Sequence, residues 1–128
     1  MDRKKLLKRA IYLIFFIFIV NFLANKFYWY SSIWYFDMIM HFLGGFWLGL
    51  VCFYLFSLKI FSQEFFHAAF KVSVFVLFIG LGWEIFELVF NNIVAQNPFN
   101  YLDASSDIFF DLSGGLCAIL YIWKKQLK

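Results

Sequence analysis

The chain has 128 residues, of which 64% are hydrophobic, 26% are aromatic and only 15% are charged. A soluble domain of this size is nearer half apolar and about a quarter charged, so the surplus apolar surface indicates a lipid environment. The length predicts a single domain over residues 1–128. The formal net charge of +3 does not indicate a nucleic-acid partner, because the bases flank hydrophobic segments, where they would set membrane orientation.

Four apolar stretches are long enough to cross a bilayer as helices, which takes roughly 17 to 25 residues. They cover residues 10–27, 36–56, 69–90 and 104–123. None alternates in the manner of a barrel strand, so the predicted fold class is all-α, an integral membrane four-helix bundle. The first stretch follows a basic tail, as in a signal peptide. No small-x-small cleavage site comes after it, and we expect an uncleaved span.

Lysine and arginine are concentrated in the N-terminal tail, around the connection between the second and third spans, and in the C-terminal tail. Only Lys26 lies on the other side. The positive-inside rule therefore predicts a multi-pass protein with both termini in the cytoplasm.

Acidic residues gather at the predicted outer ends of the last three spans. Within each span they are three or four residues apart, so each helix carries them on one face. The set comprises Asp37 and His41, then Glu84 and Glu87, and then Asp103, Asp107 and Asp111. At about 1.5 Å per residue, members from the three helices fall at two matching depths, roughly 6 Å and roughly 10 to 12 Å below the outer helix ends. We therefore expect one shared site in the outer half of the bundle.

An ionised carboxylate at membrane depth costs about 2.5 to 3.5 kcal/mol on insertion scales. Lys26 is the only base expected nearby, so shared protons or bound cations must neutralise the cluster. Carboxylates with one imidazole suit a divalent metal ion such as Mg²⁺, Mn²⁺, Ca²⁺ or Zn²⁺, and two ions would balance the charge better than one. The predicted metal ligands are Asp37, His41, Glu84, Glu87, Asp103, Asp107 and Asp111, and the predicted catalytic residues are His41, Glu84 and Asp111.

Simpler explanations exist for the aspartates nearest the helix ends. Asp103 could be the N-cap of the fourth helix, and Asp107 could favour its positive end. Asp37 could likewise begin the second helix. Glu84 and Asp111 are harder to explain in this way, because neither a cap nor water is expected at their depth. Intramembrane ionisable groups of this kind usually mark a functional site.

Three motifs follow one another along the chain: Asp37-x3-His41-Phe42-x2-Gly45, Trp83-Glu84-x2-Glu87, and Asp103-x3-Asp107-x3-Asp111-x2-Gly114-Gly115. This ordered trio resembles the YjdF-like family of small bacterial inner-membrane proteins. The resemblance implies the architecture, the site and a bacterial cytoplasmic membrane location, but no reaction. More distantly, the first motif is similar to VanZ-like membrane proteins. The Asp-x3-Asp spacing is similar to that of the metal-binding aspartates of CDP-alcohol phosphotransferases, whose fuller signature is missing.

Several functions fit these residues. The first is a metal-dependent hydrolase or transferase that acts on a membrane lipid or lipid-linked substrate at the outer leaflet, with His41 as general base or ligand. A cation or proton transporter, as a homo-oligomer, is an alternative that the apolar inner halves of the spans disfavour. A third is a metal-free aspartic hydrolase in which Asp107 shares a proton with Asp111 or Glu84. The last is a non-catalytic accessory membrane subunit whose acids hold the helices together.

Overall fold

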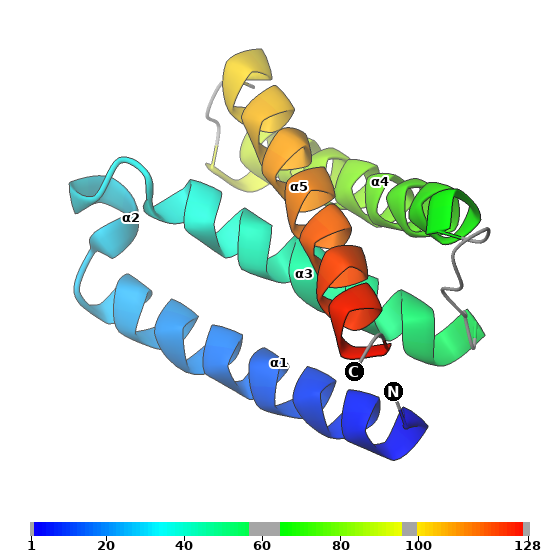
Figure 1. The fold of residues 1–128 in the computed structure, drawn as a ribbon. Coiled ribbons are helices and arrows are strands. Elements are labelled where there is room, and N and C mark those ends of the chain that lie inside the picture. The colour runs from blue at the N-terminus through cyan, green and yellow to red at the C-terminus, as the bar shows by residue number, and fades with distance from the viewer. Residues whose placement is uncertain (1, 57–64, 96–99, 127–128) are drawn as a thin grey trace.

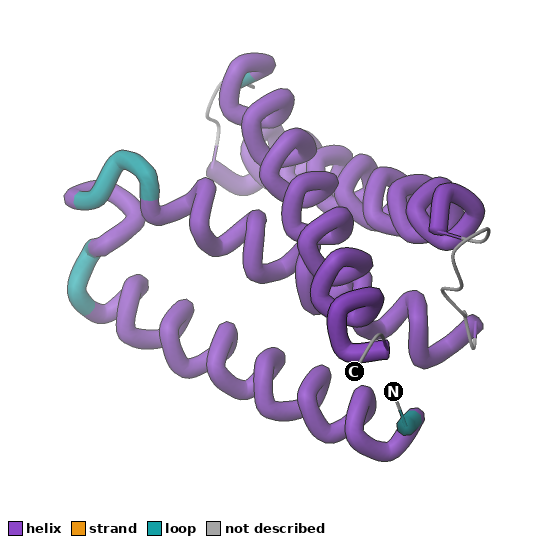
Figure 2. The backbone as a smooth tube through the Cα atoms, viewed as in Figure 1, coloured by secondary structure: helices purple, strands orange, loops and turns teal. Residues whose placement is uncertain are grey.

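The computed structural model describes residues 2–56, 65–95 and 100–126. These residues form helices and no strand (Figures 1 and 2). The elements are α1 (Arg3–Lys26), α2 (Trp29–Ser32), α3 (Phe36–Phe56), α4 (Phe65–Phe90), the π-helical turn η1 (Asn91–Ala95) and α5 (Tyr101–Gln126).

The four long helices are each long and apolar enough to cross a membrane, with a mean hydropathy between 1.3 and 2.1 over their most apolar 18 residues. Their outer surfaces carry large apolar side chains, and Phe15, Phe18 and Phe22 of α1 are all exposed. Such surfaces suit lipid rather than water. The all-α class and the four spans are therefore confirmed. The side of the membrane on which the termini lie stays a prediction.

Three helices begin several residues before the apolar stretches that predicted them. α1 begins at Arg3 rather than residue 10, α4 at Phe65 rather than 69, and α5 at Tyr101 rather than 104. Hydropathy identifies the part of a helix that lies in lipid, whereas the helix itself continues until its free backbone groups are capped. Asp2 supplies one such cap, since its side chain accepts a hydrogen bond from the Lys4 backbone N–H.

Asn100 supplies the cap of α5. Its side-chain oxygen accepts hydrogen bonds from the backbone N–H groups of Leu102 and Asp103, at 3.1 and 3.2 Å. The alternative that Asp103 is the N-cap of this helix is therefore wrong. Asp103 lies in the first turn, where its charge still favours the positive end of the helix.

α3 lies at the centre of the bundle, in contact with α1, α4 and α5 (Figure 1). Towards the chain termini the helices enclose an apolar core whose members include Leu50, Val72, Val76, Ile119 and Ile122. α1 is held to α3 there by the Trp47 indole, which donates a hydrogen bond to the Ala10 carbonyl at 3.0 Å. Among the described residues, α1 packs against α2 and α3 and does not approach α4.

α3 and α5 touch through their backbones. A Cβ atom on Gly45 would lie 2.0 Å from the Asp111 carbonyl oxygen, and one on Gly114 would lie 2.0 Å from the Phe42 carbonyl oxygen. Small residues permit this close approach of helices in a membrane. His41 near the start of α3 contacts Asp111, and Gly49 further along α3 contacts Ala118. Because the contacts advance in the same direction along both helices, the two helices run parallel. One turn from this crossing, His41 of α3 is brought against Asp111 of α5.

Candidate functional site

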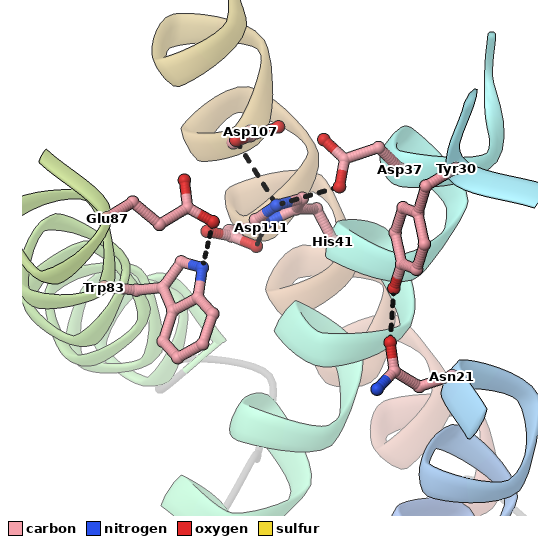
Figure 3. Close-up of polar contacts among 8 residues, drawn as sticks. All are labelled: Asn21, Tyr30, Asp37, His41, Trp83, Glu87, Asp107 and Asp111. Carbon is pink, nitrogen blue, oxygen red and sulfur yellow. Dashed lines mark hydrogen bonds and ion pairs between the residues drawn. The ribbon is translucent and has the colours of Figure 1, made fainter. Parts of the chain in front are cut away.

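His41 lies at the centre of the acidic cluster, and carboxylates from α3 and α5 converge on its ring (Figure 3). Its Nδ1 atom lies 3.0 Å from Asp111 Oδ1. Its Nε2 atom lies 3.3 Å from Asp107 Oδ2 and 3.7 Å from Asp37 Oδ1. Both ring nitrogens therefore face carboxylate oxygens, which can only accept hydrogen bonds when ionised.

The contact with Asp111 differs from the other two. At 3.0 Å it has the length of a direct hydrogen bond, so we assign the Nδ1 proton to this bond. In the neutral ring, Nε2 then carries a lone pair and faces Asp107 and Asp37 without a proton to donate. A carboxylate that fixes the tautomer in this way is a regular partner of metal-binding histidines.

A second group of acids meets Asp107 from α4. Ligand oxygens of Glu84, Glu87 and Asp107 all lie within 4.8 Å of one another. Glu84 is only 6% exposed and Asp107 only 2%. Glu84 Oε1 and Asp107 Oδ1 are buried and have no hydrogen-bond partner among the described residues. A buried oxygen without a partner costs about 1 to 3 kcal/mol, more if charged, so this arrangement calls for a proton or a cation.

Trp83 positions the remaining acid of α4. Its indole N–H donates a hydrogen bond of 2.9 Å to Glu87 Oε1 (Figure 3). The two residues are four apart, so they lie on one face of the helix. Glu87 is thereby directed towards α3 and α5, with one oxygen bound and the other available.

Six of the seven residues predicted from sequence belong to a ligand group or contact His41 directly, and Asp103 lies near them without joining either group. Asp103 is exposed and lies outside both ligand groups. Asp111 comes together with His41 rather than with the three acids around Glu84. Whether the six bind metal or catalyse a reaction stays a prediction. Ser113, two residues after Asp111, donates a hydrogen bond from its hydroxyl to the Phe109 carbonyl at 2.8 Å.

Gly80 makes room for Asp111 and was not predicted. A Cβ atom at this position would lie 2.9 Å from Asp111 Oδ2. Gly80 is four residues before Glu84 and so lies on the same face of α4. That spacing is the signal that could have identified it in the sequence.

A cavity of about 560 Å³ opens beside the cluster, bounded by α1, α2, α3, α4 and, through Asp111, α5. Its apolar wall includes Met40, Trp47, Leu48, Ile79 and Trp83, and its polar wall includes Asp37, His41, Glu87 and Asp111. The cavity is thus amphipathic, with the acids and the imidazole on one side.

The sequence did not predict that α1 and α2 contribute to this cavity through Asn21, Asn25 and Tyr30. The Tyr30 hydroxyl donates a hydrogen bond of 2.6 Å to Asn21 Oδ1 (Figure 3). Burial first, and the Asp37 carboxylate second, raise the pKa of Tyr30 above its ordinary value of 10.0. The phenol therefore stays protonated and keeps its donor at neutral pH.

Residues 1–127 match the family model described as "Predicted membrane protein (DUF2238)". No curated protein and no solved structure matches the chain significantly. The match supports a small membrane protein of the expected kind, and the finer resemblance to YjdF-like or VanZ-like proteins stays a prediction. With its four apolar helices, this multi-pass membrane protein belongs to the DUF2238 family of predicted membrane proteins.

Proposed function

We propose that this protein is a divalent-metal-dependent hydrolase or transferase that acts on a membrane lipid or a lipid-linked substrate. One observation carries the proposal. Three acids of the cluster (Asp37, Glu87 and Asp111) and His41 line one side of an amphipathic cavity between the helices, and the buried Glu84 and Asp107 lie behind them. A lipid could place its polar head against the acids and its hydrocarbon against the apolar wall.

The distances around His41 Nε2 suit a bound cation. Two ligand atoms each about 2.1 Å from one ion are about 3.0 Å apart at a right angle and about 3.4 Å apart at the tetrahedral angle. The separations from Nε2 to Asp107 and Asp37 are 3.3 and 3.7 Å. A direct charge-assisted hydrogen bond would be shorter, about 2.7 to 2.9 Å.

A cation at this position would supply two kinds of assistance. It would polarise the ester or phosphoryl oxygen of the substrate, and it would make a bound water a stronger nucleophile. In hydrolysis, the water oxygen bonds to the carbonyl carbon or phosphorus, the bond to the leaving oxygen breaks, and that oxygen takes up a proton. Glu87 lies at the cavity wall and is a candidate to receive the proton that the water loses.

The transporter alternative has less support. An ion path would have to continue from the cluster through the other half of the bundle. Among the described residues, the buried polar or charged side chains are Glu84, Asp107 and Asp111, all in the cluster. The remaining buried interior is apolar, which presents a high barrier to an ion.

The test is lipid turnover by the purified protein. The protein would be reconstituted into liposomes of phosphatidylethanolamine, phosphatidylglycerol and a polyprenyl phosphate, with Mn²⁺ or Mg²⁺, and the lipids analysed by mass spectrometry. We expect a metal-dependent product that EDTA abolishes and that Glu84→Gln does not form. Asp103→Asn makes the same type of change outside both ligand groups and should retain turnover. If the metal-loaded wild type converts none of these lipids, the proposed function is rejected.

A further inference from the structure

The cluster contains two overlapping ligand groups rather than one. The first consists of Asp37, His41 and Asp107, and the second of Glu84, Glu87 and Asp107. Each offers three ligand atoms that lie within 4.8 Å of one another. Asp107 is the one residue common to both.

The two oxygens of Asp107 have different surroundings. Oδ2 lies 3.3 Å from His41 Nε2 and so belongs to the first group. Oδ1 is buried and has no hydrogen-bond partner among the described residues, and the same is true of Glu84 Oε1. Because Glu84 and Asp107 are 6% and 2% exposed, bulk water does not solvate these oxygens. Because Asp107 also belongs to the second group, we assign its unpartnered Oδ1 to that group, so that the carboxylate offers one oxygen to each.

We infer that the site holds two divalent cations at once, with Asp107 as the ligand that both share. This inference rests on the proposed metal-dependent function and adds the number and arrangement of the ions. A carboxylate that binds one ion through each oxygen holds two ions at the separation typical of two-metal sites, about 3.5 to 4 Å.

Charge supports two ions over one. The five clustered carboxylates, Asp37, Glu84, Glu87, Asp107 and Asp111, carry a formal charge of −5 when ionised beside a neutral His41. One divalent cation leaves −3, and two leave −1. The basic group that faces these carboxylates within the described cluster is His41, and its protonation would supply only one positive charge.

The two positions differ in chemistry. The position at His41 offers a nitrogen and two carboxylates, a set that suits Zn²⁺ or Mn²⁺. The position at Glu84 and Glu87 offers oxygen alone, which suits Mg²⁺, Mn²⁺ or Ca²⁺. Mn²⁺ is acceptable to both and is paramagnetic, so it is the probe for the experiment.

The experiment counts Mn²⁺ in the detergent-purified full chain. Protein stripped with EDTA would be reloaded with Mn²⁺ and freed of unbound ion by gel filtration, then analysed by elemental analysis and electron paramagnetic resonance. We expect two Mn²⁺ per chain and a spin-coupled spectrum. Glu87→Gln should retain one ion with the spectrum of isolated Mn²⁺, and Asp107→Asn should weaken both sites. The matched control Asp103→Asn, one turn away on α5, should keep two coupled ions.

The wild type alone can overturn the inference. One Mn²⁺ per chain, or two ions without spin coupling, would refute the shared centre and leave the single-metal form of the proposed function standing. No bound Mn²⁺ would refute both. Loss of only one ion in Asp107→Asn would also show that this residue is not shared.

Discussion

The two halves of the α3–α5 pair are built for different purposes. Beyond the crossing, towards the chain termini, the buried side chains are Leu50, Ile119 and Ile122, which pack together as an apolar core. Before the crossing, the buried side chains are Asp107 and Asp111, and both contact His41. The first half gains stability from burial. The second half contains buried acids that oppose stability, an arrangement typical of sites where function outweighs stability.

The basic and acidic ends also differ in how charges are satisfied. At the basic end, Arg3 donates a hydrogen bond of 3.1 Å to the Tyr54 carbonyl, and Arg9 donates one to the Tyr121 hydroxyl. These contacts join α1 to the ends of α3 and α5. At the acidic end the carboxylates meet other carboxylates. The basic end therefore holds the bundle together, while the acidic end is arranged to receive positive charge.

The largest expected effect is at the crossing that separates the two halves. Gly45→Ala would put a Cβ atom 2.0 Å from the Asp111 carbonyl oxygen, and the backbone must move to relieve the contact. We expect a loss of about 3 kcal/mol in the free energy of unfolding, the upper end for overpacking. Gly44→Ala is the matched control, because nothing lies within 4 Å of its Cβ position. Thermal unfolding in detergent measures both, and equal losses would contradict the backbone contact.

Removal of bound metal should lower the thermal stability through the acidic half alone. Binding of a cation at a hundred times its Kd stabilises the folded state by about 2.7 kcal/mol, so EDTA should lower the thermal midpoint and added Mn²⁺ should restore it. Ile119→Ala in the apolar half should cost about 2 to 5 kcal/mol and leave this metal-dependent difference unchanged. A midpoint of the wild type that is indifferent to EDTA and Mn²⁺ would contradict the prediction.

Glu84→Gln should change the free energy of unfolding in opposite directions with and without metal. In EDTA the amide can donate a hydrogen bond to the neighbouring Asp107 carboxylate, whose Oδ1 otherwise has no partner in the described chain. We expect a gain of about 1 kcal/mol in the free energy of unfolding. With Mn²⁺ present, the loss of a ligand should make the variant less stable than the wild type. Denaturant unfolding under both conditions tests this. A lower free energy of unfolding for the variant in EDTA would contradict the prediction that the buried Glu84 carboxylate destabilises the metal-free protein.

The smallest effect is expected at the mouth of the cavity. Tyr30→Phe removes the exposed hydrogen bond to Asn21 and should cost about 1 kcal/mol or less. Because the folded pKa of Tyr30 is raised above 10.0, its contribution is present below pH 10 and is lost as pH rises through the folded pKa. The difference in alkaline absorbance titration between wild type and Tyr30→Phe should show this late ionisation. A tyrosine that titrates at or below its ordinary value would contradict it.

Much of the fold could be predicted because span length and composition depend on lipid thickness, which is a fixed quantity. The grouping of acids on helix faces could be predicted for a similar reason, since a spacing of three or four residues fixes the face. The residues at which the helices begin could not be predicted from hydropathy, because polar residues extend a helix as well as apolar ones do. The cap at Asn100 therefore had no signal in hydropathy.

The internal order of the site depends on helix rotation, which sequence spacing does not determine. The matching depths predicted one shared site without determining which acids meet, and the crossing at Gly45 turns Asp111 towards His41. Gly80 then accommodates its other oxygen. The participation of α1 and α2 in the cavity, through Asn21 and Tyr30, depends on how two helices lie in space. No local pattern records that arrangement.

The crossing of α3 and α5 also has a symmetry. Both helices carry an aspartate, a polar residue four positions later and then a Gly-Gly pair at the same spacing: Asp37, His41, Gly44 and Gly45 in one, and Asp107, Asp111, Gly114 and Gly115 in the other. Parallel packing brings His41 of one copy against Asp111 of the other. The copies differ at His41 and Asp111. With aspartate at both positions two like charges would meet, and a histidine in one copy replaces that repulsion with a hydrogen bond. It also makes the two helices unequal, because α3 presents a nitrogen and a carboxylate to the cluster whereas α5 presents carboxylates alone.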